Sequence, residues 1–134
     1  MNSFRIIAKI DIKDEAVIKG VNFEGMRKVG IASEFAKKYY LSGSDELIIN
    51  DVNASFFGRT TALNFLKNSC KNIFIPITLQ GGFRSLDNIK MAFRNGADKI
   101  SLNTGAVKNK KLISKASMKF GNQAIVVSID VKKM

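Results

Sequence analysis

Three carboxylates stand where short apolar runs of the sequence end, and that placement suits acid–base chemistry. Asp11 ends the first run, Asp51 the second and Asp130 the fifth. If the runs are parallel strands of a closed barrel, the first and the fifth lie opposite each other, so Asp11 and Asp130 face across its mouth. Two carboxylates that flank a substrate can act as general acid and general base. The alternative is that each Asp caps a loop or the next helix, and for Asp51 a structural role or a substrate-hydroxyl contact fits better.

Two loops offer backbone N–H groups for a phosphate. Gly81 and Gly82 follow the third run and allow a close backbone approach, and Ser85 then begins a helix whose first N–H groups favour an anion. Asn103 and Thr104 repeat the arrangement after the fourth run. Two adjacent loops of this kind would form one phosphate cradle, although a Gly pair is equally often a simple turn.

Charged side chains form two further groupings. Lys19 lies in the long loop that we expect at residues 12–30, after the first run, where a Lys either closes over a phosphate or stays solvated. Arg5, Glu46 and Lys99 each stand near the start of a run, so we expect them in a ring around the bottom of a barrel. Charges on that face most often stabilise the fold as an ion-pair network.

A parallel sheet has to position these side chains, and the sequence pattern predicts one. Short β-branched runs alternate with segments of helical spacing. Strands are expected at Phe4–Asp11, Glu46–Asp51, Phe74–Leu79, Lys99–Asn103 and Ala124–Asp130, and helices at Ile31–Leu41, Thr60–Lys71, Leu86–Asn95 and Lys110–Phe120. Apolar strands separated by helices indicate an α/β fold whose parallel sheet is covered on both faces or closed into a barrel.

An internal repeat favours the closed barrel over an open doubly wound sheet. Residues 43–50 read Gly-Ser-Asp-Glu-Leu-Ile-Ile-Asn, and residues 96–103 read Gly-Ala-Asp-Lys-Ile-Ser-Leu-Asn, two βα units further along. Such repetition is expected of a barrel that grew by duplication of a two-unit piece. The sequence therefore predicts the (β/α)₈ TIM-barrel family, with residues 1–134 as a single domain that supplies about four βα units and a fifth strand.

Composition narrows the class of protein. The chain has 134 residues, 46% of them hydrophobic and 25% charged, with a net charge of +11, and the Lys residues are scattered as on a solvated surface rather than gathered for nucleic acid. A single cysteine and the absence of histidine argue against a disulfide, a zinc site and Ser-His or Cys-His catalysis. No apolar run is long enough to span a bilayer and no secretory signal is evident, so we expect a cytoplasmic protein without membrane contact.

Taken in order, the motifs resemble the cyclase subunit family of imidazole glycerol phosphate synthase. The resemblance implies an enzyme of histidine biosynthesis, a lyase that adds glutamine-derived ammonia to a ribulosyl aminoimidazole carboxamide nucleotide and forms imidazole glycerol phosphate. It implies a glutaminase subunit as partner, a phosphorylated small-molecule substrate and no cofactor. It covers nearly the whole chain and is carried by Arg5-Ile6-Ile7, Asp11-Ile12-Lys13-Asp14, Val17–Phe23, Gly81-Gly82-Phe83-Arg84-Ser85, Gly96–Lys99, Asn103–Val107 and Ile129-Asp130.

The resemblance also implies a role for each candidate residue. Asp11 and Asp130 would be the acid–base pair, and Lys19 would lie on a closing loop. The remaining roles are a terminal-phosphate site, an ammonia entrance at the barrel bottom and a contact with the glutaminase. The terminal-phosphate site falls on Gly82, Asn103 and Thr104, and the ammonia entrance on Arg5, Glu46 and Lys99. The contact with the glutaminase falls on Asp98.

Departures from the family pattern leave other functions open. Lys9 stands where the family usually has Cys, Gln80 replaces the first of three glycines, and Ile31-Ala32 replaces Asp-Pro. The segment around Lys9 is similar to a paralogue group that delivers ammonia for amidation of surface-polysaccharide sugars. A complete family member has eight βα units, so we expect this chain to be the N-terminal half of a barrel, or a non-catalytic, phosphate-binding half-barrel that self-associates through open barrel edges.

Overall fold

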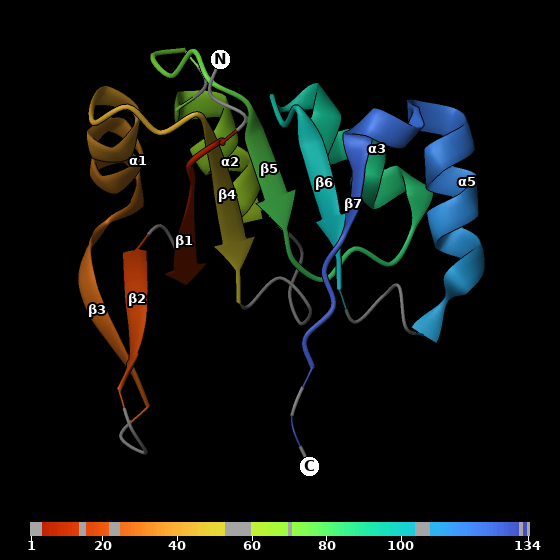
Figure 1. Ribbon diagram of the computed structural model, residues 1–134, viewed down its shortest axis with the longest axis horizontal. Coiled ribbons are helices and arrows are strands. Elements are labelled where there is room, and N and C mark those ends of the chain that lie inside the picture. The colour runs from red at the N-terminus through yellow and green to blue at the C-terminus, as the bar shows by residue number, and fades with distance from the viewer. Residues whose placement is uncertain are drawn as a thin grey trace.

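Parallel strands alternate with helices along most of the chain (Figure 1). The computed structural model describes residues 4–13, 16–21, 25–52, 60–69, 71–103, 108–131 and 133. These residues contain a seven-stranded sheet in the order β3-β2-β1-β4-β5-β6-β7. Its parallel part consists of β1 (Ile7–Lys13), β4 (Glu46–Asp51), β5 (Ile77–Gln80), β6 (Lys99–Leu102) and β7 (Ile125–Val127).

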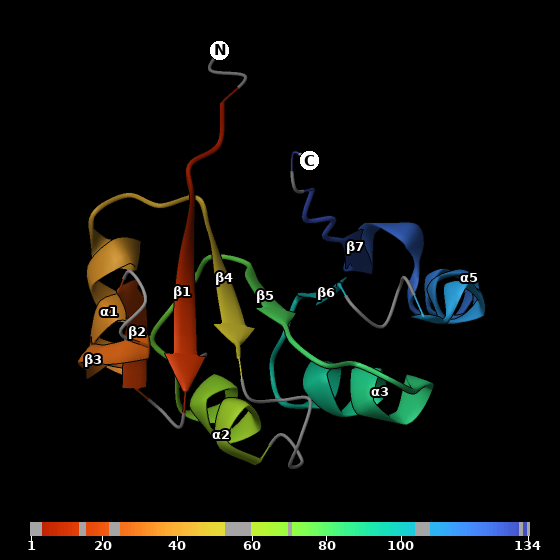
Figure 2. The same ribbon diagram turned by 90° about the horizontal axis from the view of Figure 1, so that it is seen from below.

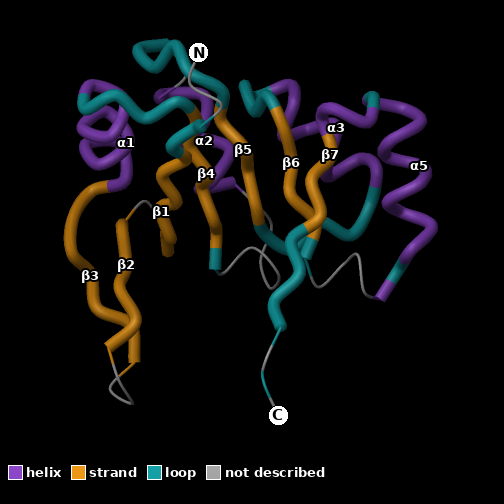
Figure 3. The backbone as a smooth tube through the Cα atoms, viewed as in Figure 1, coloured by secondary structure: helices purple, strands orange, loops and turns teal. Residues whose placement is uncertain are grey.

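The helices of the described residues lie on one side of a curved sheet. They are α1 (Ala32–Leu41), α2 (Thr60–Ser69), α3 (Leu86–Arg94) and α5 (Lys110–Phe120), and a short 3₁₀ helix at Asn122–Ala124 leads into β7. Figure 2 shows β1, β4, β5, β6 and β7 along an arc with the helices outside it, and Figure 3 shows the alternation of helix and strand. One buried cluster joins the strands to the helices and includes Ile10, Leu47, Leu79, Ile100, Ala36, Leu66, Ile89 and Ala116. The side chains that alternate with these strand residues therefore face the concave side.

The two repeated sequence segments hold equivalent places in the sheet. The Asp45 N–H donates to the Ile6 carbonyl at 2.8 Å, and Asp45 Oδ2 accepts from the Ile6 N–H at 2.7 Å. Asp98 makes the same two hydrogen bonds with Ile77, each at 2.8 Å. We call each pair of bonds an Asp clasp; one fixes the start of β4 beside β1, and the other fixes the start of β6 beside β5. The parallel sheet thus contains two equivalent two-strand pieces.

The predicted α/β fold is confirmed as an incomplete barrel, with differences at the ends of some elements. The strand Glu46–Asp51 and the helix Lys110–Phe120 have the predicted bounds. The strand predicted from Phe74 begins only at Ile77, since Phe74 is 80% exposed and Pro76 has no N–H to donate. The last strand ends at Val127 instead of Asp130. No helix in the described ranges has the length and apolar character that a bilayer crossing requires.

The expectation of a plain loop over residues 12–30 is wrong, because most of this stretch forms an antiparallel hairpin. β2 (Ala16–Val21) and β3 (Gly25–Ile31) pair with each other, with a register shift between Val17 and Ile18. β2 also pairs with the end of β1 through Val17 opposite Ile12. Val17 is 7% exposed and belongs to the core, which ties the base of the hairpin to the rest of the molecule.

Candidate functional site

The concave face of the sheet is polar at its centre. Apart from Ser69, the buried polar side chains of the described residues are Glu46, Thr78, Gln80 and Ser101. They come from the adjacent strands β4, β5 and β6, and each neighbours a residue whose side chain packs in the core beneath the helices. Burying polar groups costs free energy unless they are hydrogen-bonded or used. The concave face is therefore the candidate functional surface.

Two Asp–Asn pairs lie at the carboxyl ends of the strands. Asn50 at the end of β4 donates its side-chain amide to Asp11 Oδ1 at 2.9 Å, and these two residues are register partners. Asn103, directly after β6, donates to Asp130 Oδ2 at 3.1 Å. Asp11 is partly buried and Asp130 is exposed. Each carboxylate is thus oriented by an amide from the neighbouring strand.

Both predicted acid–base residues lie at the same edge of the sheet. Asp11 is near the end of β1, and Asp130 follows β7 by a few residues. The strands β4, β5 and β6 separate β1 from β7 in the sheet, and the arc of Figure 2 turns β1 and β7 toward the same concave side. The two carboxylates therefore lie at the carboxyl ends of the strands, and each has a different Asn as its partner.

Asn50 was missed by the sequence analysis, although the repeat contained the signal. Asn50 ends the segment 43–50, and Asn103 ends the segment 96–103. The sequence points to Asn103 because, with Thr104, it repeats the phosphate-loop arrangement after a predicted strand, whereas Asn50 is followed by Asp51. Treating the two Asn residues as equivalent positions would have found both.

The predicted phosphate loops also lie at the carboxyl ends of the strands, and only part of them falls within the described residues. Gly81 and Gly82 follow β5, and the buried Phe83 anchors the loop in the core. Ser85 is the N-cap of α3, as predicted, and its hydroxyl accepts from the Asn88 N–H at 3.2 Å. Thr104 lies outside the described residues. The phosphate cradle itself stays a prediction.

Of the three charges predicted at the barrel bottom, Glu46 is in contact with both of the others. Glu46 Oε1 is 2.5 Å from Arg5 Nη1 and 3.4 Å from Lys99 Nζ. The Arg5 side chain is 64% exposed and that of Lys99 27%, whereas that of Glu46 is 9% exposed. A carboxylate buried to this degree requires such counter-charges. The amino end of the concave face thus carries a charged cluster, formed by Arg5, Glu46 and Lys99.

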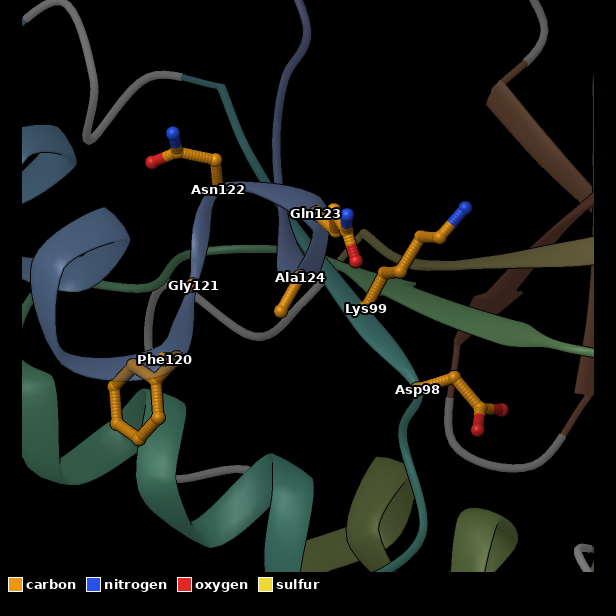
Figure 4. A pocket seen from close by; sticks show the side chains of 7 residues that line it. All are labelled: Asp98, Lys99, Phe120, Gly121, Asn122, Gln123 and Ala124. Atoms are coloured by element: carbon orange, nitrogen blue, oxygen red, sulfur yellow. The ribbon is translucent and has the colours of Figure 1, made fainter.

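Asp98 lies on the face formed by the amino ends of the strands, between two hollows. The larger, about 590 Å³, is lined by Asp98, Lys99, Phe120 and residues 121–124 (Figure 4). The smaller, about 320 Å³, is lined by residues 73–77 with Gly96 and Asp98. In Figure 4 the Lys99 side chain extends away from Phe120 and Asn122, consistent with its contact with Glu46 on β4. The carboxylate of Asp98 is already engaged in its Asp clasp.

Lys19 is not brought into contact with the other candidate residues. It is exposed on β2 of the hairpin, opposite Arg27 in the strand register. Among the described residues it has no ion pair or side-chain hydrogen bond. Its predicted role over a substrate would therefore depend on where the hairpin lies when a substrate is bound.

The chain resembles proteins of known function over nearly all of its residues. Residues 5–134 match a family model described as "Histidine biosynthesis protein". The chain is 47% identical over 99% of its length to the imidazole glycerol phosphate synthase subunit HisF of Legionella pneumophila, and 48% identical over 100% to that of Sulfolobus acidocaldarius. It covers 63% of the first relative and 54% of the second, so it spans little more than half the length of these relatives.

Proposed function

The chain belongs to the histidine biosynthesis protein family, and on this premise we propose that it forms, or forms part of, the cyclase of imidazole glycerol phosphate synthase. In this reaction, ammonia released from glutamine is added to a ribulosyl aminoimidazole carboxamide nucleotide. The products are imidazole glycerol phosphate and a carboxamide ribonucleotide. The activity is that of a lyase, and its pathway would place the protein in the cytoplasm.

One observation carries this proposal: a single polar face joins two groups of side chains suited to the two halves of the reaction. The charged cluster at the amino end is the proposed entrance for ammonia. Asp11 and Asp130, each oriented by an Asn amide, lie at the carboxyl end. A strand such as β4 spans roughly 20 Å, which is the path that ammonia would follow between the two ends.

The acid–base step is assigned to the two Asp side chains. Asn50 occupies Oδ1 of Asp11, so Oδ2 remains to exchange a proton with the substrate. In the same way Asn103 occupies Oδ2 of Asp130 and leaves Oδ1. One carboxyl group would take a proton from the attacking nitrogen while the other protonates the leaving group.

Substrate binding is assigned to the loops at the carboxyl edge. Gly81, Gly82, Asn103 and Thr104 would hold a terminal phosphate through backbone N–H groups and short polar side chains. The hairpin with Lys19 would close over the opposite part of the substrate.

The partner is proposed to be a glutaminase bound at the amino-end face. The relatives are named as a subunit of a synthase. This face has two hollows beside Asp98 into which side chains of a partner can insert. The proposed ammonia entrance opens at the same end of the sheet.

Turnover with ammonium salts as the nitrogen source tests the proposal without a glutaminase. Asp11→Asn and Asp130→Asn should each lower the rate of imidazole glycerol phosphate formation by about 100-fold or more, because each removes a proton-transfer group. Asp87→Asn, at an exposed position of α3, is the matched control. Circular dichroism checks that the variants fold. Unchanged turnover in Asp11→Asn, or no ammonia-dependent turnover in the parent protein, would contradict the proposal.

The position of Lys9 favours a second candidate, delivery of ammonia to an amidotransferase that acts on surface-polysaccharide sugars. Lys9 puts an amine on the concave face where the family usually has Cys. In that case the protein with its glutaminase partner would pass ammonia to a third enzyme and would not cyclise the nucleotide. The turnover assay above separates the two candidates.

A further inference from the structure

Four polar side chains form one row across the concave face of the sheet. Asp11 on β1 is the register partner of Asn50 on β4. Asn50 is in turn the partner of Gln80 on β5, and Gln80 that of Ser101 on β6. Each of the four alternates along its strand with residues of the buried core, so all four side chains face the concave side. Neighbouring strands lie about 4.8 Å apart, so adjacent members of this polar row can contact the same small molecule.

Gln80 and Ser101 are nearly buried and yet lack hydrogen-bond partners. Gln80 is 6% exposed and Ser101 2%, and neither side chain makes a hydrogen bond in the part of the chain that the structure describes. Among the described residues, Ser69 Oγ is the one buried side-chain polar atom that is sealed from solvent without a partner. The polar ends of Gln80 and Ser101 are therefore still reached by solvent. Since the opposite side of the strands is packed beneath the helices, solvent reaches them from the concave face.

Asn50 continues the row toward Asp11. It donates one N–H of its side-chain amide to Asp11 Oδ1 at 2.9 Å, which leaves its second N–H and its carbonyl oxygen for a ligand. An amide and a hydroxyl both donate and accept hydrogen bonds, and neither carries a charge. From Asn50 to Ser101 the row thus offers uncharged groups of both kinds, and the Asp11 carboxylate ends it.

Groups of this kind fit a ligand that has several hydroxyls. Polar groups that stay unpartnered in a nearly buried place cost free energy, and hydrogen bonds from a ligand recover that cost. A hydroxyl donates and accepts as these side chains do. Because the groups are spread over three adjacent strands, a chain with hydroxyls on successive carbons fits them better than a single carboxamide does. The carboxylate at the end of the row disfavours an anionic group there.

We propose that Asn50, Gln80 and Ser101 form a binding subsite for the hydroxyl groups of an open-chain sugar phosphate, with Gln80 as its specificity-determining residue. The proposal rests on the proposed function and deepens it, since the ribulosyl part of the cyclase substrate is such a chain. Gly81 directly follows Gln80, so a phosphate on the predicted glycine loop would bring the attached chain to the row. The hydroxyls would then be held beside Asp11, where the proposed proton exchange takes place.

Two phosphates with carbon chains of equal length test the subsite. D-ribulose 5-phosphate carries oxygens along its chain, whereas pentyl phosphate carries none. Titration calorimetry of the parent protein should show about tenfold tighter binding of ribulose 5-phosphate, because a site built to hydrogen-bond hydroxyls rejects the analogue that lacks them.

Substitutions in the row should remove this preference. Gln80→Met keeps the length of the side chain without its amide, and the preference should fall to about threefold or less. Ser101→Ala, a smaller change, should lower it by about threefold and provides a second test if Gln80→Met does not fold. Asn72→Met, which removes an exposed amide from the turn after α2, is the matched control and should keep the preference of the parent. Circular dichroism checks the fold of each variant.

The binding measurement needs no turnover, so it separates failure of the subsite from failure of the proposed function. Equal affinities of the parent for the two phosphates, no detectable binding of ribulose 5-phosphate, or a preference that both row variants retain would overturn the subsite. A preference that is lost in Gln80→Met supports the subsite, even if the parent shows no ammonia-dependent turnover and the assignment as a cyclase falls.

Discussion

Short polar side chains at strand ends do much of the positioning in this molecule. Asn50 and Asn103 each turn an Asp toward a fixed orientation, and Asp45 and Asp98 each fix the start of a strand. A hydrogen bond from a backbone N–H to a carboxylate is stronger than one to a neutral acceptor in the same place. The Asp clasps should therefore contribute measurably to stability although both Asp residues are exposed.

Removal of an Asp clasp tests this contribution. Asp45→Ala and Asp98→Ala should each lower the free energy of unfolding by about 1–2 kcal/mol, because each leaves a backbone N–H of the sheet without its acceptor. Asp45→Asn and Asp98→Asn keep an acceptor oxygen and should lose less. Urea unfolding measures the change, with Asp87→Ala as the exposed control. If Asp98→Ala were as stable as the control, the clasp would be only a geometric coincidence.

The charged cluster should depend more on Glu46 than on Arg5. Glu46→Gln leaves two cations side by side without a counter-charge, so a loss of about 1–3 kcal/mol in unfolding free energy is expected. Arg5→Met should cost less than about 1 kcal/mol, since the Arg5 side chain is mostly in solvent. Thermal unfolding of the two variants at equal salt gives the comparison, and the reverse order of losses would argue against a cluster centred on Glu46.

At the scale of single residues, the sequence predicts which side chains gather at one end of the sheet better than it predicts which of them touch. Arg5, Glu46 and Lys99 could be grouped because strand starts gather at one end of a parallel sheet. The partnership of Asn50 with Asp11 could not, because it depends on the register between β1 and β4. A register of strands is set by packing and hydrogen bonds across the sheet, which no single segment contains.

Among the elements, the hairpin of β2 and β3 is the one that the sequence did not reveal. Its strands contain Gly20 and Gly25 and three basic residues, Lys19, Arg27 and Lys28, and this composition is typical of an exposed loop. The local sequence has little propensity for a strand, and the hairpin is stabilised instead by pairing of β2 with β1 and by burial of Val17. Helix α5 could be predicted to the residue because its apolar side chains recur at helical spacing and Gly121 follows it.

Two substitutions on β2 distinguish a packed hairpin from a loose loop. Val17→Asp should lower the unfolding free energy by about 3 kcal/mol or more, because it buries a carboxylate in the core. Lys19→Asp, two residues further along and exposed, should change it by less than about 0.5 kcal/mol. Urea unfolding of both variants is the measurement. Similar, small effects for the two would mean that the base of the hairpin does not pack on the core in solution.

For the whole molecule, the main consequence of the open arc is exposed apolar surface along β7 and the segment that follows it. Val126, Val127, Ile129 and Val131 are all exposed, Ile129 to 74%, and within the described residues β7 pairs with β6 alone. Apolar edge strands are sites of pairing between chains. The barrel class could be predicted from alternation and repeat, but this exposure depends on the curvature of the folded sheet.

Self-association of this chain through β7 is therefore expected. The sedimentation coefficient should rise with protein concentration, and Val127→Lys should reduce that rise by placing a charge on the edge. Lys133→Ala lies beyond the apolar segment and should leave the rise unchanged. A coefficient that stays at the monomer value at all concentrations would remove the half-barrel dimer from consideration.

The Asp clasp has one more consequence, for how such a sheet can be built. Everything that makes the joint, a Gly turn, an Asp and the first residue of the following strand, lies within a few consecutive residues, and the receiving strand contributes only the backbone of one Ile. A joint of that kind is portable. The receiving strand takes part only through its backbone, so the identity of its side chain does not matter. Copying the short segment with the Asp is therefore enough to align each new strand on the one already in place.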